Sequence, residues 1–250
     1  MPLRARLLVA LLILLLPLAR ISAQSHVYLF NNSLADQNGG PNLVSDGGTL
    51  SATGYTFGAN QGLELTNAFA NPAKYTIAMH FALTGVGYHG WTKVLDYKDR
   101  SSDGGFYQSP WYSADLHADP GAIVGDGPAN VYSTGVMQMT VLTRSAGNVF
   151  TAYVNGIQQF STVDASGFSI FSTPTQLARF FEDDVFNGLE GAPGTIDYLA
   201  IWDTALAPDQ VPVTVPVTST PEPASVFLMG TGLVALGAAR RRRNRIHSAH

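Results

Sequence analysis

The chain has 250 residues, no cysteine, and 18 acidic against 14 basic residues. The lack of cysteine excludes disulfides, iron–sulfur clusters and thiol catalysis. Eight of the 14 basic residues but only one of the 18 acidic residues lie outside residues 24–220, so this body has six basic and 17 acidic residues and a net charge of −11. Such an acidic body argues against nucleic acid as a partner, because phosphate binding needs clustered Lys and Arg.

The N-terminus has the three parts of a secretory signal peptide. Arg4 and Arg6 precede an apolar run at residues 7–18, and small residues follow up to Ala23. We expect residues 1–23 to be removed on export. The alternative is an uncleaved membrane anchor, for which the run is short, because a bilayer-spanning helix needs about 20 apolar residues.

Residues 75–83, YTIAMHFAL, have the clearest strand pattern, because large apolar residues alternate with small or polar ones. This period of two predicts a strand with one buried face. Gly, Asn, Asp, Ser and Thr separate the other short apolar runs, and no long helical period occurs. Weaker strand signals lie at residues 26–30, 62–65, 93–97, 122–124, 136–143 and 177–180.

Residues 96–121 combine aromatic side chains with several aspartates. Carbohydrate sites are commonly built in this way, because a flat ring covers the apolar face of a sugar and carboxylates accept hydrogen bonds from its hydroxyls. The alternative is a long loop whose aromatic side chains pack onto the domain. The candidate ligand-binding residues are Tyr107, Trp111, Tyr112 and Asp115.

Two later patterns complete the prediction of a β-sandwich. In residues 148–161, Asn155-Gly156 separates two β-prone runs, and Asn-Gly suits the positive φ angles of a type I′ hairpin turn. Residues 195–203 form a strand that is apolar on both faces, as in a central strand between two layers. Nine or more short strands separated by turns predict an all-β sandwich or jelly roll over residues 24–210.

The acidic stretch RFFEDDVFNG at residues 179–188 contains a candidate catalytic motif. Glu182 and Asp184 are similar to the first part of the Glu-x-Asp-x-(x)-Glu signature of jelly-roll laminarinases. A retaining glycosidase needs a second carboxylate, but positions 186 and 187 hold Phe and Asn. We therefore expect no catalytic residues and no enzymatic activity.

Both ends of the body resemble laminin-G-like, concanavalin A-like jelly rolls. The similar segments are YLFNNSLADQNGG at 28–40, AYVNGIQ at 152–158 and NGLEGAPGTIDYLAIWDTALAPDQV at 187–211. The resemblance implies a concanavalin A-like jelly-roll β-sandwich and says little about the ligand.

The same resemblance implies a structural Ca²⁺ held by an aspartate in the last strand. Asp197 occupies that place, and Asp36 or Asp46 would supply a second carboxylate. A carboxylate among apolar neighbours is costly unless it is paired or metal-bound. The alternative is that Asp197 accepts hydrogen bonds from backbone amides or lies at a sheet edge.

After a predicted helical turn near residues 203–210, alternating Pro, Val and Thr at residues 211–220 predict an extended linker. The chain then reads Pro221, Glu222, Pro223, an uncharged run at residues 224–239, and arginines at 240–243 and 245. The arginines would stay on the cytoplasmic side of a short transmembrane helix.

This C-terminal segment, residues 221–245, resembles the PEP-CTERM sorting signal of Gram-negative bacteria that make exopolysaccharide. The resemblance implies that a membrane-embedded exosortase recognises the tripeptide and removes the tail after a transient stay in the inner membrane. The residues concerned are Pro221, Glu222, Pro223, Arg240, Arg241, Arg242 and Arg243. A plain C-terminal anchor is the alternative and predicts the same topology.

Taken together, these features predict an exported, non-catalytic protein of the cell surface or extracellular matrix. We expect it to bind carbohydrate, such as exopolysaccharide, or another surface component. Two alternatives stay open: a structural or adhesion protein without a small ligand, and a jelly-roll glycan hydrolase. The sequence decides neither the ligand nor the oligomeric state.

Overall fold

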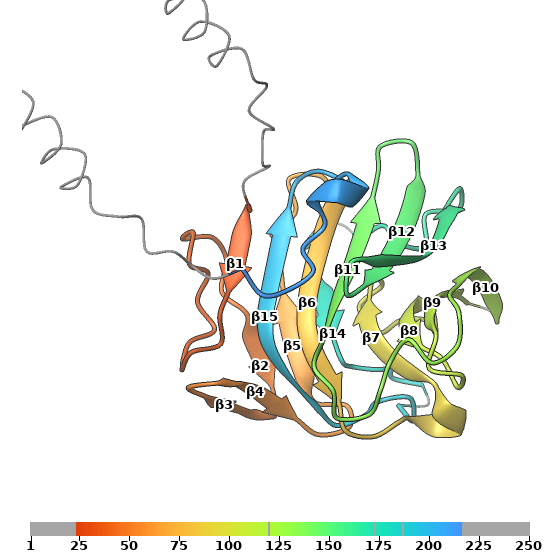
Figure 1. Cartoon of the computed structure of the whole chain (residues 1–250). Coiled ribbons are helices and arrows are strands. Elements are labelled where there is room, and N and C mark those ends of the chain that lie inside the picture. The colour runs from red at the N-terminus through yellow and green to blue at the C-terminus, as the bar shows by residue number, and fades with distance from the viewer. Residues whose placement is uncertain (1–23, 120, 173, 187, 217–250) are drawn as a thin grey trace, which may run out of the picture. The chain divides into compact units, whose positions relative to one another are not determined.

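The computed structural model describes residues 24–119, 121–172, 174–186 and 188–216. Over these residues the chain forms fifteen strands and two short 3₁₀ helices, η1 (Tyr88–Gly90) and η2 (Pro208–Gln210). The strands make two sheets, here called sheet A and sheet B (Figure 1), and the pairings among them are antiparallel. The predicted all-β sandwich is confirmed.

Sheet A contains the first and the last strand of the domain. Its central strands pair in the order β13-β12-β11-β6-β15-β4-β3, and β1 also pairs with β15. The strands are β1 (His26–Tyr28), β3 (Thr49–Ser51), β4 (Gly54–Phe57), β6 (Tyr75–Leu83), β11 (Gln138–Arg144), β12 (Val149–Val154), β13 (Ile157–Val163) and β15 (Gly194–Trp202).

Sheet B carries the candidate site described below. Its order is β10-β9-β8-β7-β14-β5-β2. The strands are β2 (Val44–Asp46), β5 (Gly62–Leu65), β7 (Thr92–Asp96), β8 (Gly105–Gln108), β9 (Ala114–Ala118), β10 (Ala122–Asp126) and β14 (Ala178–Phe180). Because β14 pairs with both β5 and β7, residues that follow position 180 come to lie beside β7.

The main hydrophobic core lies between the two sheets. It includes Ile77 and Phe81 from β6 of sheet A, and Val94, Phe106 and Leu116 from sheet B. Burial of such side chains contributes about 1.5–3 kcal/mol each, so the cysteine-free domain has its main source of stability here.

A second apolar cluster covers the outer face of sheet A. There, Leu206 and Val211 pack with Ala78, Val141 and Trp202. Strand β15 is therefore covered on both faces, as predicted. The pattern of β6 had predicted one buried face, but Ala78 is buried on the other face as well. Residues from 211 were expected to be an extended linker, yet Val211 is buried and Val215 packs against the same cluster.

The alternative for residues 96–121, a long loop with packed aromatic side chains, is wrong about the loop, whereas Phe106 and Tyr107 are buried as that alternative expected. Two strands of sheet B, β8 and β9, lie within this stretch. The signal was present in ADLHA at residues 114–118, where Leu116 faces the core between the polar Asp115 and His117. Abundant turn residues around these short strands concealed their period of two.

A β-bulge at Asp197 changes which side chains of the last strand share a face of the sheet. Ile196 pairs with Phe81, and Tyr198 pairs with His80, the next residue on β6, so Asp197 has no cross-strand partner. The extra residue moves the side chains that follow to the opposite faces. Ile196 consequently shares the inner core with Leu199 rather than a face with Tyr198.

Candidate functional site

A polar site lies on the outer face of sheet B, where the middle strands carry side chains that do not enter the core. Phe106 and Leu116 point into the sandwich. Because neighbouring residues of a strand point to opposite faces, Tyr107 and Asp115 face outward. Lys93 pairs with Tyr107 across β7 and β8, and Tyr107 pairs with Asp115 across β8 and β9.

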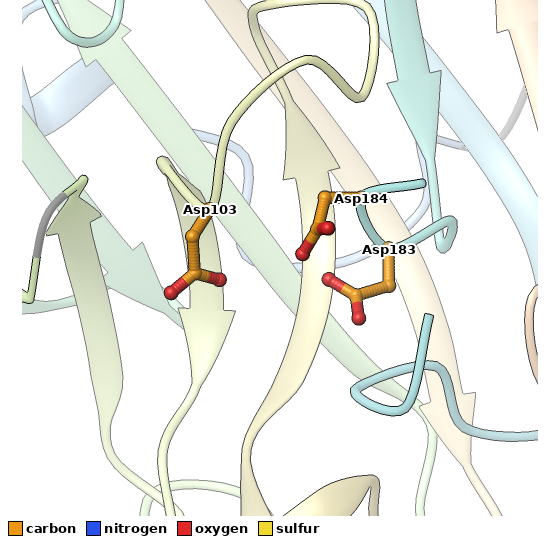
Figure 2. A group of neighbouring side chains, drawn as sticks. All are labelled: Asp103, Asp183 and Asp184. Atoms are coloured by element: carbon orange, nitrogen blue, oxygen red, sulfur yellow. The ribbon is translucent and has the colours of Figure 1, made fainter. Parts of the chain in front are cut away.

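Three aspartates converge at this face, as Figure 2 shows. Oxygen atoms of Asp103, Asp183 and Asp184 all lie within 4.8 Å of one another. Asp103 precedes β8, whereas Asp183 and Asp184 follow β14. A hydrogen bond of 3.0 Å from the Phe181 amide to the Val94 carbonyl holds the second segment against β7.

Lys93 supplies the positive charge within this acidic group. Its side chain is fully buried, and its Nζ lies 3.3 Å from Asp183 Oδ1 and 3.4 Å from Asp96 Oδ2. It donates to the Ser102 carbonyl at 3.2 Å, and it lies 5.4 Å from the centre of the Tyr107 ring. The ammonium therefore offsets part of the repulsion between the carboxylates.

Each carboxylate of the three already has a partner. Asp183 Oδ2 accepts a hydrogen bond of 2.9 Å from the Glu190 amide, and Asp184 Oδ1 accepts one of 2.7 Å from the Phe186 amide. Asp103 Oδ1 accepts the Tyr107 hydroxyl at 3.0 Å. A metal ion would have to displace these contacts. The Asp103 side chain is 45% exposed, so it is the member that solvent or a ligand reaches.

An aromatic group borders the aspartates. The ring of Trp91 lies 5.8 Å from that of Tyr107 and 5.3 Å from that of His117, and both pairs meet edge to face. His117 Nε2 is 3.8 Å from Asp103 Oδ2. Burial lowers the pKa of His117, so the ring tends toward its neutral form. Trp91 is only partly buried, and it is linked to Asp103 through Tyr107 and His117, which contact both residues.

Glu190 is a carboxyl group of this site whose pKa is shifted toward neutral pH. Burial, with the nearby Asp103 and Asp183, raises the pKa of Glu190 to about 7. Lys93 and the Tyr107 hydroxyl act in the opposite direction. Sequence reasoning did not find Glu190, Lys93, Trp91 or Asp183, because their pattern is not local.

Of the two residues of the incomplete glycosidase signature, Asp184 belongs to the group of three aspartates and Glu182 does not. Glu182 is fully buried, and its Oε2 accepts Arg179 Nη1 at 3.0 Å and Arg100 Nη1 at 3.2 Å. A carboxylate enclosed by two guanidinium groups is an ion-pair partner within the fold rather than a group that faces a substrate.

The structure separates the four predicted ligand-binding residues. Tyr107 and Asp115 are cross-strand neighbours, but both side chains are fully buried. Trp111 is 59% exposed in the turn between β8 and β9. Tyr112, in the same turn, has a positive φ and packs against the main core. The four residues do not form one surface.

The three aspartates predicted to hold calcium each have other surroundings. Asp36 accepts hydrogen bonds from the amides of Val27, Asn38 and Gly40, and it contacts His26. Together these contacts occupy both oxygens of the Asp36 carboxylate. Asp197 lies in the bulge of β15 in sheet A, partly exposed and 2.7 Å from His80 Nδ1. Asp46 lies on β2 of sheet B. Asp197 thus contacts His80 rather than Asp36 or Asp46, and a structural Ca²⁺ at these residues stays a prediction.

The terminal segments fall outside the described residues. They include the predicted signal peptide at 1–23 and the predicted apolar helix at 224–239. No helix within the described ranges is long and apolar enough to span a bilayer. A family model for the PEP-CTERM protein-sorting motif matches residues 219–243, which include Pro221, Glu222, Pro223 and the arginines at 240–243. The motif indicates export, a membrane-anchored intermediate and processing by exosortase.

Solved structures with the same fold include proteins that act on glycans. Domain 4 of AbnA, a GH43 extracellular arabinanase from Geobacillus stearothermophilus, in complex with arabinotriose, matches with a TM-score of 0.56 and 18% identity. The match covers 77% of this chain and 98% of that domain. Trypanosoma rangeli sialidase in complex with 2,3-difluorosialic acid matches with a TM-score of 0.54 and 12% identity, over 76% of this chain and 30% of the sialidase. At these identities the likeness establishes the fold alone.

No curated protein matches the chain. A family model described as the concanavalin A-like lectin/glucanases superfamily matches residues 57–212, which is more than half of the chain. These residues contain the strands of both sheets from β5 onward, together with the acidic and aromatic site. The protein therefore belongs to the concanavalin A-like lectin/glucanases superfamily and carries a PEP-CTERM sorting signal at its C-terminal end.

Proposed function

We propose that this exported, exosortase-processed protein is a non-catalytic carbohydrate-binding module of the cell surface or extracellular matrix. One observation carries the proposal: the partly exposed Trp91 lies in one group with the half-exposed Asp103 on the outer face of sheet B. The indole would cover the apolar face of a sugar ring, and Asp103 Oδ2 would accept a hydrogen bond from a hydroxyl.

Two features support the position of this site. Tyr107 and His117 contact both Trp91 and Asp103, so the ring and the carboxylate are held in fixed relation before a ligand arrives. Such preorganisation reduces the entropy lost on binding. The domain of the arabinanase that shares this fold was solved with an oligosaccharide, arabinotriose, which supports the same class of ligand for this chain.

Affinity electrophoresis tests the proposal. The full-length protein is run in gels that contain exopolysaccharide from the producing bacterium, and we expect the sugar to retard it. Trp91→Ala and Asp103→Asn are each expected to weaken binding about tenfold or more, because each removes a direct contact. Trp111→Ala is the matched control, since it deletes an indole that is 59% exposed but outside this ring group.

Each outcome of this experiment decides something. Loss of retardation with Trp91→Ala alone supports the site on sheet B. Loss with Trp111→Ala alone would move the binding surface to the turn between β8 and β9. No retardation of the wild-type protein in any polysaccharide gel would favour a structural or adhesion protein without a small ligand.

A glycan hydrolase is the second candidate, and Glu190 is the observation that favours it. Its pKa of about 7 suits a general acid, and Asp103 and Asp183 are the nearby carboxylates. Release of new reducing ends from a polysaccharide by the wild-type protein, abolished by Glu190→Gln, would replace the non-catalytic proposal with this one.

A further inference from the structure

Asp115 on β9 is a buried carboxylate whose surroundings do not compensate its charge. Its side chain is 0% exposed, and neither of its oxygens accepts a hydrogen bond of good geometry within the part of the chain that the structure describes; the polar groups beside it are Asp126 and the hydroxyls of Ser109 and Ser113. An isolated buried carboxylate costs several kcal/mol, so such a group requires an explanation.

A second carboxylate lies directly beside it. Asp126 on β10 is the cross-strand neighbour of Asp115, and the amide of Gly127 donates to the Ala114 carbonyl at 3.0 Å, which fixes this register. Burial and the adjacent Asp126 raise the pKa of Asp115 to about 8. The cationic group that faces the same side of the sheet, Lys93, is already committed to Asp96 and Asp183.

Hydroxyl groups complete the surroundings. Ser113 Oγ donates to Asp126 Oδ1 at 3.2 Å, and it also contacts the hydroxyl of Ser109. Both serines are buried, whereas Asp126 is exposed at the edge of the sheet. The arrangement groups two carboxylates and two hydroxyls, with the exposed Asp126 on the solvent side.

We propose that Asp115, Asp126 and the Ser113 hydroxyl bind one divalent cation, with Ca²⁺ as the expected ion. Ca²⁺ takes six to eight oxygen ligands in flexible geometry, and water can supply the remainder on the exposed side of Asp126, whereas Mg²⁺ demands a near-octahedral set. A cation pairs with both carboxylates and ties the edge strand β10 to β9. This inference does not depend on the proposed carbohydrate site.

The Asp103, Asp183 and Asp184 group is the weaker cation site, although it has more carboxylates. Its oxygens accept hydrogen bonds from Tyr107 and from two backbone amides, and Lys93 already contributes a positive charge. Asp115 has beside it only the Ser109 and Ser113 hydroxyls and Asp126, with no backbone amide donor and no cationic side chain among the described residues.

Isothermal titration calorimetry of the full-length protein, stripped with EDTA and titrated with CaCl₂, tests the proposal. We expect uptake of one ion with a dissociation constant of about 10⁻⁴ to 10⁻³ M, as in extracellular calcium modules. Asp126→Asn is expected to weaken binding at least about tenfold, because it removes a charged ligand from an exposed position without disturbing the core. Asp209→Asn, an exposed aspartate in η2, is the matched control and should bind as the wild type does.

Thermal unfolding gives a second readout that guards against misfolded variants. Ca²⁺ should raise the melting temperature of the wild-type protein and of Asp209→Asn, but not that of Asp126→Asn, because only binding to the folded state stabilises it. The circular dichroism of Asp126→Asn should match the wild type. Asp115→Asn should likewise lose the calcium effect.

Two results would overturn the inference. One is the absence of heat and of any thermal shift with the wild-type protein at about 10 mM Ca²⁺, well above the expected constant; the carboxylate pair would then share a proton. The other is uptake that survives Asp126→Asn and disappears with Asp103→Asn, which would place the ion in the other acidic group.

Discussion

A single residue changes which side chains of the last strand reach the core. The bulge at Asp197 adds one residue to β15 between the partners of Phe81 and His80. Alternation beyond that point is reversed, and Asp197 itself is a partly exposed partner of His80. A period-two pattern predicts the strand correctly but cannot locate such an insertion, because the partner strand decides it.

Glu190 is a second single residue with its own effect, because its contribution to the stability of the fold depends on pH. The pKa of Glu190 in the folded protein, about 7, lies above its value of 4.5 in the unfolded chain. The folded state therefore binds this proton more tightly, and the stabilisation is complete below the unfolded pKa and is lost as the pH rises through about 7.

We predict that Glu190→Gln reduces the loss of stability between about pH 5 and pH 8. The expected difference is on the order of 1 kcal/mol, because water screens a side chain that is only partly buried. Urea unfolding of both proteins at the two pH values measures it. A variant that loses as much stability as the wild type over this range would show that the pKa of Glu190 is not raised in the folded protein.

At the scale of elements, the sequence predicts the Asn155-Gly156 hairpin but not the hairpin formed by β8 and β9. Asn155 and Gly156 have φ angles of 51° and 79°, which confirms the predicted turn between β12 and β13. The β8–β9 turn at residues 109–113 holds neither Asn nor Gly and closes through hydrogen bonds between Ser109, Tyr112 and Ser113. A turn is visible in sequence when its residues have special backbone freedom, and it is hidden otherwise.

We predict that Gly156→Ala destabilises the domain more than Gly135→Ala does. Both glycines have positive φ, 79° and 73°, so each alanine costs about 1–2 kcal/mol in backbone strain. A Cβ at Gly156 would also collide with the Val213 side chain, whereas the space at Gly135 is open. Chemical unfolding of the two variants measures the difference.

A second substitution separates the two causes. If the collision is real, Val213→Ala should recover part of the loss in Gly156→Ala and none of the loss in Gly135→Ala. Equal effects of the two glycine variants would argue that residues 211–215 do not pack on the hairpin.

At the scale of the whole molecule, the two ends direct the chain and the middle folds. The family match to the sorting motif covers residues 219–243, separate from the match to the sandwich at 57–212. The basic residues concentrate in the ends, so the exported body is strongly acidic. Removal of the tail therefore changes both the anchorage and the net charge of the protein.

We predict that exosortase removes the arginine-rich tail in the native cell. Mass spectrometry of the cellular protein should find a C-terminus close to Pro221–Pro223, and deletion of the exosortase should leave the chain extending to His250 in the membrane fraction. Intact chains ending at His250 as the main species in wild-type cells would contradict this expectation.

The sequence by itself determined the all-β class, the Asn-Gly hairpin and the sorting signal, because each depends on local features: alternation, turn residues, or an ordered run of motif, apolar stretch and charge. Tertiary structure decided the candidate site. Asp103 and Asp183 lie far apart in the chain and meet because β14 inserts between β5 and β7, with Arg179 opposite Asp96. Likewise, only the register of β9 and β10 sets Asp126 against the buried Asp115. Strand order and register arise from long-range pairing, and no short stretch of sequence encodes them.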